Sequence, residues 1–571
     1  MQPDLLLLKP KVYNSYFKQW TETNVAVKDG KFMYIGPRGE ESFQAGRVID
    51  ASGLYMVPGF IDIHLHIEST MVTPGSFSQG LLRNGVTTIV PEPHEMANVF
   101  GLDGVLEMIN ASRDCEVDMF YAIPSSVPAT SLETSGGSIE IEDMEALLAT
   151  GDVICLGEIM NYVDIITDPD CKTNRILKHM KEHHPELVIE GHVPKLLDLD
   201  LQRVIFAGVD SDHTHQTVEG LKARIGAGMF IEIQEKSMTP EIMDYLVKHD
   251  VSEHFCFVTD DVMADSFEAR GHLNHIVRKA IGMGMAPEKA IYAATSSPSR
   301  RMRLYDRGTI APGKTADFQL ISSLSDLKLE AVYKNGKEAY TAAAPSQPKT
   351  AGYRFPDHFY RSVQLHELSE ADFAAKVGVE DGTYLCRVMT VQDGSTFTQE
   401  SRVELQAADG CLQWEGSGLG MIATFERYGK HGGKAFGLIG GDTIQKGAVA
   451  TTYSHDNHNL LVVGHNVKDM LLAANTVIRQ QGGFCVVSDG EVTANMHLPV
   501  GGILTEEPLE SAAESVKRLR EAMQALGYKH YNPIMSIATH SLPVSPYLKI
   551  TDRGLIDVNA GQVVPLIIEK R

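Results

Sequence analysis

The chain lacks the cysteine pattern of a disulfide scaffold or of a cysteine-rich zinc site. Its 571 residues include seven cysteines, an odd number, and no two of them form a Cys-x-x-Cys pair. They are scattered along the whole chain, at Cys115, Cys155, Cys171, Cys256, Cys386, Cys411 and Cys485. This usage predicts reduced thiols and a cytoplasmic location.

Basic residues and long apolar runs are also scarce. The 51 Lys and Arg residues are outnumbered by 74 Asp and Glu residues, which gives a formal net charge of -23. Binding to nucleic acid through counterion release needs clustered cations, so this balance excludes a nucleic-acid partner. The first ten residues have neither a basic segment nor a long apolar core, and no run approaches a membrane span. We therefore expect a small-molecule partner and no membrane partner.

Residues 1–55 and 304–340 show the same kind of secondary-structure pattern. Short strand patterns fill residues 1–55 and return in residues 304–340, where Asn335-Gly336 predicts a hairpin turn. We expect these two segments to form one small β domain. A Pro/Ala-rich linker over residues 341–352 then leads to a C-terminal α+β domain over residues 353–571.

Residues 56–303 alternate short apolar strands with helical patterns, which predicts a (β/α)8 barrel. The fold class is therefore α/β, with a metal-dependent barrel at its centre. The eight expected strands are Gly59–Ile63, Thr87–Val90, Met119–Ile123, Val153–Leu156, Leu187–Glu190, Gly208–Asp210, Met229–Ile233 and Phe255–Thr259.

Histidines and acidic residues follow six of these eight strands. His64 and His66 are one residue apart at the end of a strand, so their imidazoles face the same side. The other strand-end candidates are His94, Glu95, Glu158, His192, His213 and Asp260. Each alone has a structural reading, such as a buried loop histidine or a helix N-cap. Together, at the rim where a barrel carries its catalytic groups, they predict a metal site.

The donors are nitrogen and oxygen, which suit Zn, Mn or Fe better than Mg or Ca. Six candidate ligands are more than one tetrahedral site needs, and the two oxygens of Glu158 suit it to bridge two ions. We therefore expect two divalent metal ions and a water molecule activated by them.

Three stretches resemble the adenine deaminase family of the amidohydrolase superfamily. They are Pro58-Gly-Phe-Ile-Asp-Ile-His-Leu-His-Ile-Glu-Ser, Pro93-His-Glu-Met-Ala-Asn and Ser454-His-Asp-Asn-His-Asn. The resemblance covers essentially the whole chain and implies hydrolysis of adenine to hypoxanthine and ammonia with Mn or Fe bound. It implies that the metal ligands are His64, His66, Glu158, His192, His213 and Asp260. It also implies that Glu95 carries a proton, with His94 and Asp260 as further catalytic candidates.

The chain departs from the family pattern at Lys195, Thr214 and Val262, which we expect in the loops of the substrate pocket. These departures leave open a deaminase or cyclic-amide hydrolase of the same superfamily that acts on another heterocycle. A catalytically silent scaffold or purine sensor is the alternative from another class. We also expect a homo-oligomer.

The motif Ser454–Asn459 has two readings. Ser, Asn and Asp often satisfy their own backbone in loops. Alternatively, His455, Asp456 and His458 form a lid or an extra metal site at the barrel mouth.

Overall fold

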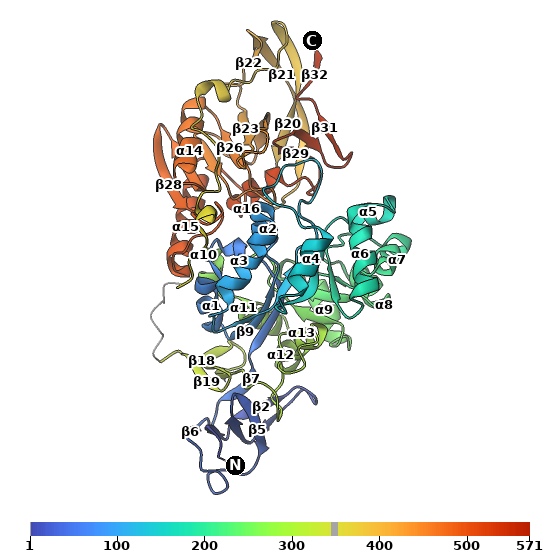
Figure 1. Cartoon of the computed structure of the whole chain (residues 1–571), viewed down its shortest axis with the longest axis vertical. Helices are drawn as coiled ribbons and strands as arrows, with labels where there is room; N and C mark the ends of the chain where they lie inside the picture. Colours follow the sequence, from blue (N-terminus) through green and yellow to red (C-terminus); the bar gives the residue numbers. More distant parts are fainter. Residues whose placement is uncertain (1, 344–351) are drawn as a thin grey trace.

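The computed structural model describes residues 2–343 and 352–571. Figure 1 shows three parts along the long axis of the molecule: a small β part that contains the N-terminus, a barrel in the middle, and a C-terminal α/β part. Residues 344–351, most of the expected linker, lie outside the described residues. The division of the chain after residues 55, 303 and 340, and at residue 353, stays a prediction.

The N-terminal flank and the segment after residue 303 share a sheet. In this sheet β7 (Tyr55–Pro58) pairs antiparallel with β17 (Phe318–Ser323) and parallel with β2 (Lys11–Asn14). Its outer strands are β3 (Gln19–Glu22), β18 (Lys328–Lys334) and β19 (Lys337–Thr341). A second sheet contains β5 (Lys31–Gly36), β4 (Asn24–Lys28), β1 (Leu5–Leu8) and β6 (Arg47–Asp50).

The predicted hairpin at Asn335-Gly336 is confirmed. It joins β18 to β19, and both turn residues have positive φ values, 51° for Asn335 and 71° for Gly336. Positive φ at both central residues is what a two-residue type I′ turn requires, and Asn-Gly tolerates it best.

The predicted (β/α)8 barrel is also confirmed. Its strands are parallel wherever they pair, and they occupy eight successive positions. They are β8 (Phe60–Leu65), β9 (Val86–Pro91), β10 (Asp118–Met119) with β11 (Tyr121–Ile123), β12 (Val153–Ile159), β13 (Val188–Gly191), β14 (Ser211–Asp212), β15 (Phe230–Ile233) and β16 (Phe255–Phe257). The Asp260 amide donates to the His64 carbonyl at 3.1 Å, which closes the ring between the last strand and the first.

Two strands differ from the sequence expectation. The third is split into β10 and β11, and the sixth lies at Ser211–Asp212 rather than at Gly208–Asp210. The sixth strand has two residues and no apolar alternation, so neither its position nor its length has a clear sequence pattern.

Helices surround the barrel. Helix α9 (Pro240–Lys248) illustrates their local logic: the Thr239 side chain caps its N-terminus, Pro240 occupies the first turn, and Ile242, Met243 and Leu246 face the core. The others are α1 (Pro74–Leu82), α2 (His94–Phe100), α3 (Leu102–Ser112), α4 (Ile141–Leu148), α5 (Tyr162–Thr167), α6 (Lys172–His183), α7 (Asp198–Ala207), α8 (Val218–Gly226), α10 (Ala264–Arg270), α11 (Leu273–Gly282), α12 (Pro287–Ala293) and α13 (Ser296–Arg301), with the 3-10 turns η1 (Ile67–Thr70) and η2 (Glu235–Ser237).

The C-terminal part is built on one large sheet with helices packed on it. The sheet contains, in spatial order, β22 (Cys411–Leu412), β21 (Thr398–Ala408), β20 (Gly382–Val391), β24 (Lys434–Gly441), β23 (Gly420–Phe425), β26 (Leu460–Gly464), β25 (Ala448–Thr451), β27 (Gly483–Ser488) and β28 (Glu491–His497), with β32 (Ile567–Lys570) paired to β20. The remaining elements are α14 (Val467–Arg479), α15 (Leu509–Ala525), α16 (Pro533–Ala538), η3 (Asp357–Tyr360), η4 (Glu370–Asp372), η5 (Thr539–Ser541) and the small sheet of β29 (Leu548–Thr551), β30 (Gly554–Asp557) and β31 (Gln562–Val564).

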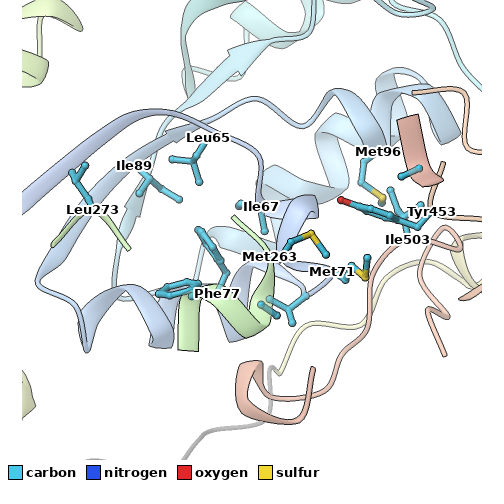
Figure 2. Close-up of a cluster of buried hydrophobic side chains, with 14 of the residues drawn as sticks. Leu65, Ile67, Met71, Phe77, Ile89, Met96, Met263, Leu273, Tyr453 and Ile503 are labelled. Atoms are coloured by element: carbon cyan, nitrogen blue, oxygen red, sulfur yellow. The ribbon is translucent and has the colours of Figure 1, made fainter. Parts of the chain in front are cut away.

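The C-terminal part and the barrel share one hydrophobic core. In Figure 2, Tyr453 and Ile503 from the C-terminal part lie near Met71, just after η1, and Met96, in α2. The Thr505 amide donates to the Met71 carbonyl at 2.8 Å, which adds a backbone link between the two parts. The C-terminal part is therefore fixed over the loops that follow the first two barrel strands.

No helix within residues 2–343 and 352–571 is long and apolar enough to cross a membrane.

A buried ion pair joins α13 to the inside of the barrel. Arg301 Nη2 lies 2.7 Å from Glu190 Oε1, and both side chains are nearly inaccessible to solvent. Glu232 is buried beside them. The pKa of Glu232 is raised well above its usual range, mainly by burial and secondly by the nearby Glu190 carboxylate. Arg301 therefore compensates charge in a region where water cannot.

Arg301→Met should lower the free energy of unfolding by about 3–5 kcal/mol, because it leaves Glu190 buried without its partner. Chemical denaturation measures this. Arg300→Met is the matched control, since Arg300 pairs with Glu253 at the surface, where such pairs contribute about 0–1 kcal/mol. Equal losses in the two variants would contradict the buried pair.

Candidate metal centre at the barrel mouth

The first strand presents two buried imidazoles at its end. The rings of His64 and His66 are 5.2 Å apart and perpendicular. His66 Nδ1 lies 3.0 Å from the Glu92 carbonyl, which can only accept, so this nitrogen carries the proton. The other nitrogen, Nε2, is then left as a lone-pair donor for a metal.

Glu158, at the end of β12, faces two groups of histidines with its two oxygens. Oε1 lies 3.6 Å from His66 Nε2. Oε2 lies 2.8 Å from His192 Nδ1 and 3.2 Å from His213 Nε2. A carboxylate divided in this way can contact two cations at once. The backbone amide of Glu158 donates to Glu92 Oε2 at 2.7 Å, which holds its strand end in place.

His192 and His213 follow the next two strands and converge. His192 Nδ1 lies 3.0 Å from His213 Nε2, and the His213 ring stacks on His64 with 3.8 Å between centroids. His213 is buried, whereas 38% of the His192 side chain is exposed. His192 therefore marks the side on which the cluster reaches solvent.

Asp260 follows the eighth strand and completes the ring of ligand candidates. Its Oδ1 lies 3.6 Å from His66 Nε2 and 3.9 Å from His64 Nε2. Lys236 Nζ lies 3.3 Å from the other oxygen, Oδ2. Burial alone would raise the pKa of Asp260, but Lys236 and the nearby imidazoles hold it well below its usual range.

These six residues include groups that could hold a divalent metal ion. His64, His66 and Glu158 place one donor atom each within 4.8 Å of one another, as do Glu158, His192 and His213. His64 Nε2 is buried and has no hydrogen-bond partner among the described residues, which is costly for a polar atom unless a ligand satisfies it. The donors are nitrogen and oxygen, the set that Zn, Mn and Fe accept.

His94 and Glu95 lie beside the cluster, in the first turn of α2. His94 Nε2 is 3.4 Å from Glu95 Oε1, and the His94 ring packs edge-on against His66 with centroids 4.5 Å apart. Burial alone would lower the pKa of His94, but the Glu95 carboxylate raises it to about 10. Burial alone would raise the pKa of Glu95, but His455, His458 and His94 hold it well below its usual range. Both directions favour an ion pair, with the proton on the His94 imidazole and Glu95 ionised.

The loop Ser454–Asn459 reaches this point from the C-terminal part. His455 Nδ1 contacts Glu95 Oε1, and His458 Nε2 contacts Glu95 Oε2. Asp456 lies in the same buried loop, with its carboxylate 3.6 Å from His455 Nδ1.

Sequence reasoning missed two residues that shape the site, Glu92 and Lys236. Glu92 lies within the second strand-end motif, two residues before His94, and its pKa is raised to about 8 by burial and by Glu158. Lys236 lies in η2 after the seventh strand, whose end had offered no candidate. A charged residue just past that strand was the available signal.

The three departures from the family pattern lie in different surroundings. The Thr214 hydroxyl donates to Asp212 Oδ2 at 3.0 Å, and Arg224 Nε donates to the same oxygen at 2.7 Å. Thr214 is thus committed to a buried structural network rather than free for a substrate. Lys195 Nζ lies 5.1 Å from the Phe397 ring centroid, across the junction with the C-terminal part. Val262 is half-buried next to the exposed Asp261.

The barrel is that of an amidohydrolase, and the amidohydrolase family model matches residues 55–339. The model for the adenine deaminase C-terminal domain matches residues 395–562. Adenine deaminase 2 of Shouchella clausii (strain KSM-K16) is 59% identical over 572 residues, 100% of each chain. Adenine deaminase of Clostridium perfringens (strain 13 / Type A) is 46% identical over 571 residues, 99% of each chain. The chain belongs to the adenine deaminase family.

Among solved structures, the β-aspartyl dipeptidase of Fervidobacterium islandicum AW-1 is similar over 60% of this chain and 98% of its own. The sequence identity is 17% and the TM-score 0.48.

Thr214→Val should destabilise the protein by about 1–3 kcal/mol, because Asp212 loses a buried hydrogen-bond donor. Thr214→Ser keeps the hydroxyl and should stay close to wild type. Denaturant titration of both variants measures the difference. Equal stability of the two variants would show that the hydroxyl does not hold Asp212.

Proposed function

We propose that this protein deaminates adenine hydrolytically, giving hypoxanthine and ammonia, with two divalent metal ions bound at the barrel mouth. The observation that carries the proposal is the division of the Glu158 carboxylate between two groups of imidazoles, directly beside the His94–Glu95 pair. Two curated relatives that match 99% or more of the chain are named adenine deaminase, which supports adenine as the substrate.

The donors divide naturally between the two ions. His64, His66 and Asp260 would hold one, His192 and His213 the other, and Glu158 would contact both. Nitrogen and oxygen donors suit Mn, Fe and Zn alike. Mn or Fe is the proposed metal because the resemblance to adenine deaminases implies it, and Zn is the alternative. When bound, the metal pair would activate a water molecule for attack near neutral pH.

The residues of this chain would move the protons. Asp260, held ionised by Lys236, would accept a proton from the attacking water and pass it to the leaving amine. The His94–Glu95 pair would supply a proton to the ring nitrogen beside the reacting carbon. The balance is one water consumed, with its oxygen bonded to C6 and the C–N bond broken as ammonia leaves. One proton of the water leaves with ammonia, and the other, lost from the C6 hydroxyl as the carbonyl forms, restores the proton that the His94–Glu95 pair gave to the ring nitrogen. Both groups operate in a buried site, where positioned proton transfer is effective.

A deaminase of another heterocycle, or a hydrolase of cyclic amides, is the second candidate. Lys195 and Val262 favour it, since both depart from the family pattern near the barrel mouth. Ammonia release from a panel of aminopurines, compared with ring opening of hydantoins and dihydropyrimidines, separates the two. The cytoplasmic location and the homo-oligomeric state stay predictions.

Metal removal should abolish ammonia release from adenine, and Mn or Fe should restore it, because the proposed ligands are imidazoles and carboxylates. His64→Ala should lower metal content and turnover together, as measured by elemental analysis and an ammonia assay. His497→Ala, an exposed histidine of β28, is the control and should change neither. Full activity in metal-free protein would overturn the proposal, and metal binding without any turnover would leave a silent scaffold.

Glu95→Gln should lower kcat about 100- to 10,000-fold, because the amide keeps the size of the side chain but cannot relay a proton. Its metal content should stay at the wild-type level. Glu142→Gln, on the exposed side of α4, is the matched control. If Glu95→Gln lost metal, Glu95 would be a ligand and its proposed role would be wrong.

A further inference from the structure

The C-terminal part contributes two imidazoles to the barrel's proton relay. Both carboxylate oxygens of Glu95 are contacted from a loop more than 350 residues away in sequence: Oε1 by His455 Nδ1 and Oε2 by His458 Nε2. We infer that His455 and His458 are positioning residues that clamp Glu95 in its catalytic orientation. This inference deepens the proposed function and rests on it.

Burial makes these two contacts necessary for Glu95. The exposed fractions are 1% for Glu95, 5% for His455 and 0% for His458, so water does not replace either imidazole. A buried carboxylate without donors is strongly disfavoured. His94 contacts only Oε1, at 3.4 Å, and cannot fix the carboxylate plane alone. One donor on each oxygen fixes the plane of the Glu95 carboxylate. The same oxygen, Oε1, therefore always faces His94.

His458 is itself held rigidly. Its carbonyl accepts from the guanidinium of Arg427, a fully buried side chain. The same guanidinium donates to Ser362 Oγ at 2.6 Å and to the Gly501 carbonyl at 2.7 Å. The backbone of His458 has φ 51°, an uncommon left-handed conformation that persists where its surroundings determine it.

Two asparagines of the loop hydrogen-bond to neighbouring segments. Asn457 Nδ2 donates to the Ser541 carbonyl at 3.0 Å, and Asn459 Nδ2 donates to the Thr134 carbonyl at 2.8 Å. The residue before the loop, Tyr453, packs in the core shared with Met96, the neighbour of Glu95 (Figure 2). This arrangement is a fixed wall of the site. It argues against a hinged lid. Both ring nitrogens of His458 also have protein partners, since Nε2 contacts Glu95 and Nδ1 lies 3.3 Å from the Thr452 carbonyl, so His458 has no nitrogen left for an extra metal ion.

The experiment compares two replacements at each histidine in the full-length, Mn-loaded enzyme. In His455→Asn the amide nitrogen can take the place of Nδ1, and in His458→Gln it can take the place of Nε2. His455→Ala and His458→Ala remove the donor. The alanine variants should lower kcat at least 10-fold with KM changed less than 3-fold and both metal ions retained. The amide variants should recover a large part of the loss.

A double-mutant cycle tests whether the histidines act through Glu95. If they do, His455→Ala combined with Glu95→Gln should be no slower than Glu95→Gln alone. Multiplying losses would overturn the clamp. Loss of metal in the alanine variants would show an extra metal site, and a change in KM alone would show a substrate contact or a lid, so either outcome would overturn it as well. His497→Ala, in the same C-terminal part, should match wild type throughout.

The failure of the clamp is distinguishable from the failure of the proposed function. If wild-type protein released no ammonia from adenine, the proposed function would fail by itself. The clamp would then be tested by denaturation midpoints, which also serve if an alanine variant folds poorly. The midpoint shift of His458→Ala combined with Glu95→Gln should fall short of the sum of the single shifts, because both variants disrupt the same contact. Additive shifts would overturn the clamp.

Discussion

The arrangement of the barrel mouth depends on one buried carboxylate, that of Glu158. Its two oxygens face different imidazoles, with His66 on one side and His192 and His213 on the other. Burial would raise its pKa, and the hydrogen bonds from His192 and His213 hold it far below the usual range instead. This arrangement requires the ends of four barrel strands, which carry Glu158, His66, His192 and His213, to lie at the same level. Glu92, which accepts a bond from the Glu158 amide, sets that agreement between the second and fourth strands.

The gathering of the candidate ligands at one rim could be predicted from sequence, because it follows from two geometric rules. Alternation along a strand places His64 and His66 on one side, and all parallel barrel strands end at the same rim. Neither rule reports which side chains then hydrogen-bond one another. Thr214 followed a strand end like the ligands and was expected near a substrate, yet its hydroxyl turns to Asp212. Asp212 also accepts from Arg224, on the following helix α8, and no local sequence pattern contains that contact.

The loop Ser454–Asn459 is a second case in which the sequence pattern does not reveal the partners of the side chains. Its composition indicates a polar turn and leaves three readings open: a lid, a metal site and a loop that satisfies its own backbone. The deciding contact is with Glu95, 363 residues earlier in the chain. Only the packing of the C-terminal part on the barrel brings the two together. The sequence predicted the type of secondary structure in each part of the chain. It did not predict that one part contributes side chains to the site of the other.

The shared core around Tyr453 and Ile503 has a consequence for synthesis of the protein. A ribosome produces every proposed metal ligand before it produces the last third of the chain. Until that third arrives, Met71 and Met96 lack the apolar side chains that cover them in the finished molecule. A nascent barrel therefore exposes apolar side chains at its mouth. Exposed apolar surface of this kind recruits chaperones or leads to aggregation. The reaction centre is completed last, so partial products of translation carry its ligands but not its finished form.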